Sequence, residues 1–376
     1  MKEETSESWG LLPAPVQAPT RNPSSIPLPS SAPSPRAVSR STAAIFILLS
    51  FITLTTMFQR MLAISPCAEP GKSRCYRGYA SDWSFDGAAT TNAAWMSRLP
   101  DAVNLSSLSI PGTHDTMTFS LADSRLQCQN QNLSTQLTAG VRYIDARTRL
   151  HGDTLAIYHA FQPTGHSFAD TFSTLFDFLD AHPSEALVVR VKEEGPRIGN
   201  GTLSFEDAFN LLRLQHPVLA KRFARHLYIP PRPVAALPTL GALRGKLLLL
   251  QEFRSVHGDY GVRWKSTQMV LEDLWIIPSL THLGMKWDAI RTALERAQSE
   301  PNDNSALYLA HLSASVGVLP IEAAAGSRDG SVVGMNDRTG IWLETQEKAR
   351  RGVVIMDFPG QPLLDAVIAQ NEPLMR

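Results

Sequence analysis

Short apolar runs alternate with amphipathic stretches from residue 105 to the end of the chain. Apolar runs of about 4–8 residues bounded by turn residues are typical of buried strands. Eight runs of this kind occur, at 105–110, 141–146, 154–158, 186–191, 246–250, 269–271, 307–312 and 353–356. The run at 269–271 is the shortest of them. They predict eight strands.

The stretches between these runs show the helical period. In 169–179, apolar residues recur on one face, namely Phe172, Leu175, Phe176 and Leu179. The stretch 205–214 follows a Ser204-x-x-Asp207 capping pattern, and 286–298 repeats the helical spacing. Strands that alternate with helices predict an α/β fold, and eight such units predict an irregular TIM-type β/α barrel.

Polar residues follow most of the predicted strands. They are His114, Arg147, His159, Lys192, Asp273 and Asp357. Active sites of β/α barrels lie at the carboxyl ends of the strands. The pattern therefore places a candidate site at this end of the barrel.

The N-terminal part of the chain has a different composition. Residues 1–41 are rich in Pro and Ser, which predicts a disordered tail. Residues 42–58 are apolar and uncharged, between Arg40 and Arg60, and we expect a transmembrane segment or signal anchor there. A cleaved signal sequence and a buried core helix are the alternatives. We expect 59–104 to be a lumenal linker region and 105–376 to be the catalytic barrel.

Charge and cysteine content narrow the function class. The 376 residues carry 35 Lys and Arg against 35 Asp and Glu, so no basic excess suggests a nucleic-acid partner. Of the three cysteines, Cys67 and Cys75 could close a small loop in an oxidising compartment, which leaves Cys128 over. The cysteines lack zinc-site spacing, which argues against a structural metal. Three Asn-x-Ser/Thr sequons follow the apolar run, at Asn104, Asn132 and Asn200, and favour a lumenal or extracellular barrel.

Two histidines bracket an arginine in the first half of the predicted barrel. Ser109-Ile110-Pro111-Gly112-Thr113-His114-Asp115 ends the first strand, and Asp145-Ala146-Arg147 ends the second. His159 ends the third strand. Cleavage of a phosphodiester by a neighbouring hydroxyl needs a base, an acid and positive charge on the phosphoryl oxygens. Two histidines and one arginine can supply all three.

These segments resemble the X region of phosphatidylinositol-specific phospholipases C, most closely the small single-domain bacterial type. The resemblance implies that His114 deprotonates the inositol 2-hydroxyl, Arg147 holds the phosphate and His159 protonates the diacylglycerol oxygen. It also implies that Asp357 orients the first histidine and that Asp115 assists the acid. The products would be diacylglycerol and an inositol cyclic phosphate.

The resemblance carries expectations about the metal and the head group. Calcium-dependent eukaryotic relatives have a metal-binding carboxylate at the position of Arg147, so we expect no metal and no cofactor here. Lys192, Asp273 and Trp275 match residues that contact the inositol ring. On the fifth strand, Glu252 stands where the bacterial enzymes have an inositol-binding arginine, and this charge reversal bears on head-group specificity.

The expected partner is a phospholipid at a membrane surface, and we expect a monomer. Two alternatives remain at this point. A glycerophosphodiester phosphodiesterase-like barrel would want a cluster of metal-binding carboxylates, one of which Arg147 displaces. A non-catalytic barrel that binds inositol lipids would not need His114, Arg147 and His159 together.

Overall fold

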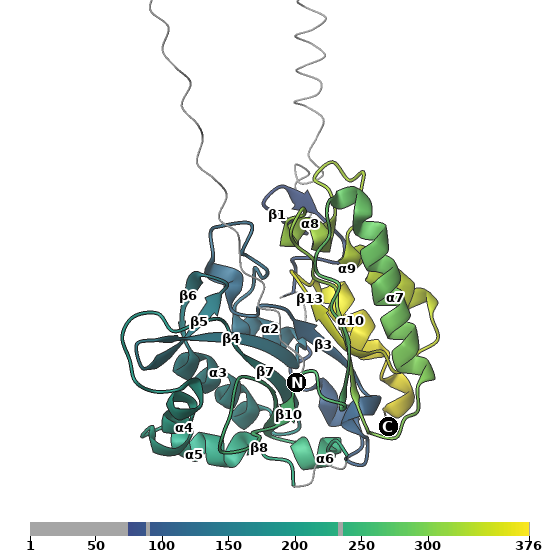
Figure 1. Ribbon diagram of the computed structural model, residues 1–376. Coiled ribbons are helices and arrows are strands. Elements are labelled where there is room, and N and C mark those ends of the chain that lie inside the picture. The colour runs from purple at the N-terminus through teal and green to yellow at the C-terminus, as the bar shows by residue number, and fades with distance from the viewer. Residues whose placement is uncertain (1–73, 88–90, 232–235, 376) are drawn as a thin grey trace, which may run out of the picture. The chain divides into compact units, whose positions relative to one another are not determined.

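Eight parallel strands form a barrel that is open at one seam (Figure 1). The structure is a computed structural model that describes residues 74–87, 91–231 and 236–375. The strands are β3 (Ser109–Thr113), β4 (Tyr143–His151), β7 (Ala186–Glu193), β9 (Lys246–Glu252), β10 (Val262–Arg263), β11 (Met269–Glu272), β12 (Leu307–His311) and β13 (Gly352–Met356). They pair in the order β10-β9-β7-β4-β3-β13-β12-β11. Among the described residues β10 and β11 do not pair, and the seam lies between them.

The predicted barrel is confirmed, but one of the eight strands was assigned wrongly. The run at 154–158 forms β5 (Thr154–His159), which is antiparallel to β4 and to β6 (Gln162–Ser167). The second half of β4 extends beyond the barrel and folds back through Gly152, whose φ is +57°. The eighth barrel strand is β10, which at two residues is too short to produce an apolar run. The first strand starts only at Ser109, because Leu105–Ser107 form a 3-10 turn, η2.

Helices cover the outside of the barrel. They are α2 (Leu133–Ala139), α3 (Phe168–Ala181), α4 (Phe205–Gln215), α5 (Leu219–His226), α6 (Leu240–Leu243), α7 (Leu283–Ser299), α8 (Pro320–Ala325), α9 (Met335–Thr345) and α10 (Gln361–Ala369). In Figure 1, α3, α4 and α5 lie on the left and α7, α9 and α10 on the right. The three predicted helices correspond to α3, α4 and α7. The Ser204 hydroxyl accepts from the Asp207 amide at the start of α4, as the capping pattern predicted.

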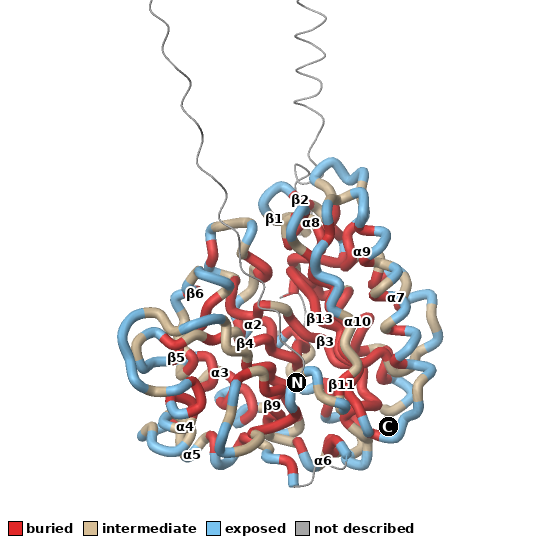
Figure 2. Tube along the Cα trace, viewed as in Figure 1, coloured by how far each residue is buried: buried red, intermediate tan, exposed pale blue. Residues whose placement is uncertain are grey.

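Strand residues alternate between two hydrophobic cores, because successive side chains of a strand point to opposite faces. On β9, Leu247 and Leu249 pack outward against the helices, whereas Leu248 and Leu250 pack inside the barrel. The strands form the most buried part of the molecule (Figure 2). This alternation leaves the carboxyl ends of the strands free for polar side chains.

The residues before Leu105, which we expected to be a linker, pack on the barrel. Trp95, Met96 and Leu99, from the 3-10 turn η1 (Trp95–Arg98) and the residue after it, belong to the inner core. Strands β1 (Cys75–Tyr76) and β2 (Tyr79–Ala80) form a small separate sheet. Tyr79 and Phe85 pack against Phe358, next to the end of β13. The remaining short elements are η3 (Thr118–Ser120), β8 (Leu227–Tyr228), η4 (Leu280–His282) and η5 (Glu372–Leu374).

Several predictions for the N-terminal part fall outside the described residues. These are the disordered tail at 1–41, the apolar run at 42–58 and Cys67. None of the helices in the described ranges is long and apolar enough to cross a membrane. Cys75 is disulfide-bonded, and Cys128 is a free, buried thiol.

Candidate active site

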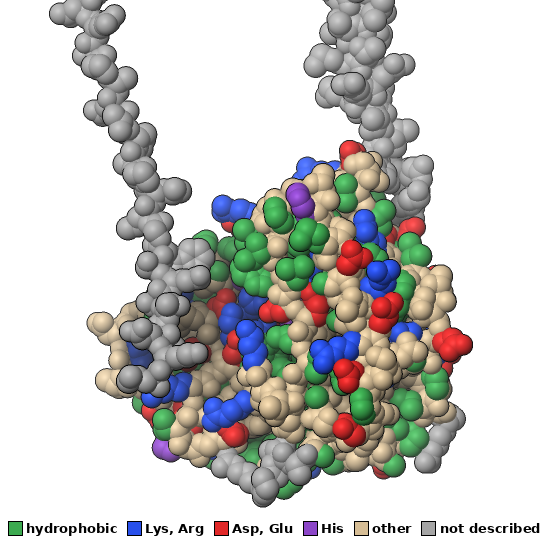
Figure 3. Space-filling model, turned by 45° about the vertical axis from the view of Figure 1, so that its right-hand side comes forward, with side chains coloured by type: hydrophobic (Ala, Val, Ile, Leu, Met, Phe, Trp, Pro, Cys, Tyr) green, Lys and Arg blue, Asp and Glu red, His purple; other side chains and the backbone are tan. Residues whose placement is uncertain are grey.

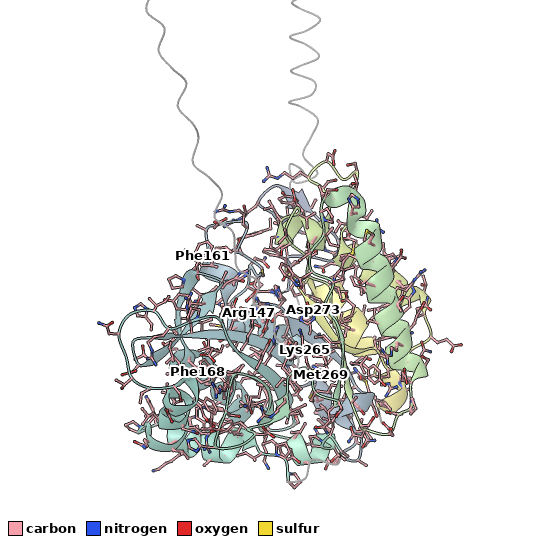
Figure 4. The ribbon with its side chains drawn as sticks, in the orientation of Figure 1. Arg147, Phe161, Phe168, Lys265, Met269 and Asp273 are labelled. Carbon is pink, nitrogen blue, oxygen red and sulfur yellow. The ribbon has the colours of Figure 1, made fainter. Side chains whose placement is uncertain are left out.

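The five predicted catalytic side chains converge at the carboxyl ends of β3, β4, β5 and β13. His114 and Asp357 follow adjacent strands, whose ends pair Thr113 with Met356. His114 Nδ1 lies 2.9 Å from Asp357 Oδ1. In Figure 4, Arg147 lies in the middle of the molecule at the level of these strand ends. His114, Arg147 and His159 retain 16%, 13% and 14% exposure of their side chains, so the cluster is reached from solvent.

Arg147 connects three members of the cluster. Its Nε lies 2.9 Å from Asp115 Oδ1 and 3.2 Å from Asp145 Oδ2. One terminal nitrogen, NH2, lies 2.5 Å from His114 Nε2. Since a guanidinium only donates, this contact requires the lone pair of the imidazole to be at Nε2. His114 Nδ1 then carries the proton and donates it to Asp357.

His159 has the opposite surroundings. Its Nδ1 lies 2.7 Å from the Leu126 carbonyl oxygen, and its Nε2 lies 3.3 Å from Asp115 Oδ2. Both partners are acceptors, which suits an imidazole that carries a proton on each nitrogen. Asp115, at a φ of +42° that non-glycine residues rarely adopt, also brings Oδ2 within 3.2 Å of His114 Nε2. One carboxylate therefore lies between the two imidazoles.

Burial and neighbouring charges shift the pKa values of several groups in the cluster. Burial and the positive charge of Arg147 hold the pKa of His114 well below its usual value of 6.5. Burial raises the pKa of Asp115, and it raises the pKa of Asp357 well above the usual range. Burial would also raise the pKa of Asp145, but Arg190 and Arg147 outweigh it and the pKa is lowered. At neutral pH the cluster thus offers an unprotonated His114 beside a permanent cation.

No family model matches the chain. The chain is 32% identical over 302 residues to the 1-phosphatidylinositol phosphodiesterase of Listeria monocytogenes, covering 76% of this chain and 86% of the relative. The chain belongs to the phosphatidylinositol-specific phospholipase C family. The solved phosphatidylinositol-specific phospholipase C from the same species is 31% identical, with a TM-score of 0.62 over 75% of this chain and 100% of that one.

A Staphylococcus aureus relative of the same name is 24% identical over 321 residues, covering 78% of this chain and 97% of the relative. A structure from that species has a TM-score of 0.61 at 20% identity, over 76% of this chain and 99% of that one, which shows the shared fold. These matches cover about three quarters of this phospholipase C family member and 86–100% of the proteins that it matches.

The three predicted head-group residues lie at different places around the cluster. Lys192 ends β7 beside Arg147, and its Nζ lies 2.7 Å from Glu194 Oε2. Asp273 Oδ1, directly after β11, lies 3.9 Å from His311 Nδ1 at the end of the adjacent strand β12. Trp275 is 45% exposed, and its carbonyl oxygen accepts from the Ser315 amide. Lys192 and Asp273 flank the cluster, whereas Trp275 lies on its outer edge.

Further polar residues of the mouth were missed in the sequence. They are Arg190, Glu194, Trp264 and His311. Arg190 contacts Asp145 at 3.3 Å and Glu252 at 2.5 Å, and its guanidinium lies 4.0 Å from the centre of the Trp264 ring. Glu194 lies 3.7 Å from Arg147 and accepts from the Ala160 amide next to His159. A partial signal existed, since Arg190 and Lys192 are charged two residues apart near the end of an apolar strand, and therefore share one face of it.

We expect the imidazole of His114 to titrate below pH 6.5 in the native protein. Replacing Arg147 by Gln should raise that pKa, because the guanidinium that opposes imidazolium formation is gone. Histidine-selective nuclear magnetic resonance titration measures both values, and His114→Gln assigns the signal. A midpoint at or above 6.5 in the wild-type protein would show that the electrostatic description is wrong.

Proposed function

We propose that this protein cleaves phosphatidylinositol-type lipids into diacylglycerol and an inositol cyclic phosphate. The observation that carries the proposal is the pair of histidines with opposite hydrogen-bond surroundings on either side of Asp115. The 1-phosphatidylinositol phosphodiesterases that the chain resembles act on the lipid that their name states.

In the first half of the reaction, His114 acts as the base. Its Nε2 lone pair accepts the proton of the inositol 2-hydroxyl while that oxygen forms a bond to phosphorus. Asp357, 2.9 Å from Nδ1, holds the ring and stabilises the imidazolium that results. Arg147 stabilises the charge that develops on the phosphoryl oxygens.

In the second half, the bond between phosphorus and the diacylglycerol oxygen breaks. His159 gives the proton on Nε2 to that oxygen, and the Leu126 carbonyl keeps the ring in place through Nδ1. Asp115 contacts both imidazoles, so it supports the acid while the base becomes protonated. One proton enters the protein at His114 and one leaves at His159.

The arrangement of Arg147 supports metal-independent catalysis. Its Nε occupies the space between Asp115 and Asp145, within 3.2 Å of both carboxylates. A calcium ion that bridged Asp115 Oδ1 and Asp145 Oδ2 would need the space that the guanidinium fills. The permanent cation of the side chain supplies at the phosphate what an ion would otherwise supply.

Lys192, Asp273 and Trp275 are the proposed head-group contacts. Lys192 and Asp273 provide a donor and an acceptor on two sides of the mouth, as a ring with several hydroxyl groups requires. The exposed Trp275 places an aromatic face at the entrance. Glu252 is directly opposite Lys192 on the neighbouring strand, and it adds a carboxylate at 28% exposure.

An apolar rim beside the mouth supports action at a membrane surface. The rim consists of Leu274, Trp275, Ile276 and Val316, which are 39%, 45%, 52% and 58% exposed. Hydrogen bonds of Ser315 with Trp275 and Ile277 join the two loops that carry them. Figure 3 shows an apolar patch next to a hollow in which charged side chains gather. All site residues come from one chain, and we propose a monomer as the working unit.

We further propose that the barrel lies on the lumenal or extracellular side, anchored by the apolar run at 42–58. The disulfide of Cys75 supports an oxidising compartment. Asn132 and Asn200 are exposed on the barrel, whereas Asn104 is half-buried. The glycosylation sequons are therefore accessible at two positions.

The variants His114→Gln and His159→Gln should each cleave phosphatidylinositol vesicles about 10²–10⁴-fold more slowly than the wild type, because each variant lacks the side chain for one proton transfer. The matched control is His166→Gln, since His166 packs on Phe119 and contacts none of the cluster. Product release is measured with purified full-length protein, and circular dichroism checks the fold. Near-normal turnover of either variant would contradict the acid/base assignment.

Chelator should leave wild-type activity unchanged in metal-free buffer, whereas Arg147→Lys should lower it about 10²–10³-fold, because an ammonium cannot reproduce the planar fork. Arg147→Asp should be inactive and at best weakly rescued by calcium, since Asp115 and Asp145 cannot fill the roughly 6–8 oxygen positions of that ion. Loss of wild-type activity on chelation would refute metal independence.

The topology predicts glycans at Asn132 and Asn200 when the full-length protein is expressed in a secretory eukaryotic host. Glycosidase treatment should shift the gel band, and the Asn132→Gln, Asn200→Gln double variant should lose most of the shift. The protein should remain in the membrane pellet after alkaline extraction. An unshifted band would contradict the lumenal barrel, and release into the supernatant would favour a secreted protein.

A further inference from the structure

The catalytic cluster contains a free thiol that the proposed reaction does not use. Cys128 is fully buried, and its backbone is fixed by hydrogen bonds from its own amide to the Thr118 hydroxyl and from the Phe358 amide to its carbonyl. Its sulfur lies within 4.8 Å of ligand atoms of Asp115 and His159. It lies within the same distance of ligand atoms of His114 and Asp357. The thiol is therefore close to both the proposed base and the proposed acid.

The ligand atoms of Asp115 and His159 have the spacing of two ligands of a tetrahedral metal site, and the Cys128 sulfur lies nearby. Asp115 Oδ2 and His159 Nε2 are 3.3 Å apart. Two ligands bound at about 2.0–2.1 Å to one zinc ion lie about 3.3–3.4 Å apart at the tetrahedral angle. The sulfur lies within 4.8 Å of both atoms, so it needs to approach by at most about 1.3 Å to reach the roughly 3.5 Å that suits a thiolate ligand.

The surroundings of these three ligands also suit a cation. His159 Nδ1 is hydrogen-bonded to the Leu126 carbonyl, which leaves Nε2 free to coordinate. Metal-bound histidines typically donate the N–H of their other ring nitrogen to a carbonyl or carboxylate in this way. Asp145 and Glu194 offset the charge of Arg147. Arg147 Nε contacts Asp115 Oδ1, whereas Asp115 Oδ2, the proposed ligand atom, lies 3.2 Å from His114 Nε2 and 3.3 Å from His159 Nε2.

We propose that Asp115, Cys128 and His159 bind a thiophilic divalent cation such as Zn²⁺ or Cd²⁺, which reversibly inhibits the enzyme. The S–H bond of Cys128 breaks, a sulfur–metal bond forms and the proton leaves to solvent, without a redox change. The ion takes the Nε2 lone pair of the proposed acid and the Asp115 oxygen that both histidines share. The fourth coordination position remains for water. Binding goes beyond the proposed function, while the inhibition rests on it.

Cadmium titration of the purified full-length protein, with its disulfide intact, tests the site directly. The wild-type protein should give a thiolate-to-cadmium charge-transfer absorbance that saturates at one equivalent. Cys128→Ser should abolish that absorbance. His159→Gln should weaken zinc binding, measured by competition with a chromophoric chelator, by at least about 10-fold. The control is His257→Ala, an exposed histidine away from the cluster, which should bind like the wild type.

A second experiment tests inhibition. For each variant, the rate with Zn²⁺ is divided by its own rate without Zn²⁺, so that a change in the basal rate cancels. Zn²⁺ should inhibit wild-type cleavage and chelator should restore it, whereas Cys128→Ala should resist the same Zn²⁺ concentration. Absence of the cadmium absorbance in the wild type, or equal zinc affinity of wild type and Cys128→Ser, overturns the site. Cadmium binding by a protein that does not cleave phosphatidylinositol would instead overturn the proposed function and leave the site in place.

Discussion

The arrangement of the active site depends on how one guanidinium offsets several buried carboxylates. Asp115, Asp145 and Asp357 are each at most 2% exposed, and Arg147 directly contacts the first two. Removing the cation from such a group leaves buried charge without compensation, which costs far more than the loss of an exposed ion pair. Arg147 therefore fixes the ends of β3 and β4 relative to each other. The proposed phosphate-binding group is therefore also a structural requirement.

The same charge balance extends across the neighbouring strands. Asp145 contacts Arg190 of β7, and Glu194, just beyond that strand, contacts both Arg147 and Lys192. Parallel pairing places Asp145 beside Arg190, which brings opposite charges together. The same register places Arg147 beside Lys192, so two cations are neighbours. Glu194 contacts both cations and offsets their repulsion. The orientation of each predicted site residue thus follows from a partner on another strand.

Local sequence was sufficient to select the five proposed catalytic residues, which the fold brings together, but not to reveal their neighbours. His114 and Arg147 end apolar runs, and such strand ends are where barrels place their sites. The strand that carries His159 is not a barrel strand, since β5 forms an antiparallel hairpin with β4. The sequence still pointed to His159, because β5 ends at the same mouth as the barrel strands. The pairing register that brings Arg190 and Glu194 together is a long-range property that one sequence does not display. Trp275 shows the limit of local patterns, since the loop that carries it pairs with Ser315, about forty residues further along the chain.

The carboxylate of Glu252 on β9 is paired with a cation from the neighbouring strand β7. Glu252 lacks the positive charge that the resemblance led us to expect on the fifth predicted strand, yet a guanidinium lies beside it. Arg190 reaches across from β7, bonds to the Glu252 carboxylate through Nε at 2.7 Å and packs on the Trp264 ring. Arg190 is 5% exposed, and Glu252 and Trp264 both contact its guanidinium. The guanidinium is therefore held in one orientation. The cation at this place in the mouth therefore comes from β7, and the Glu252 carboxylate of β9, at 28% exposure, is the side chain of this pair that solvent reaches more.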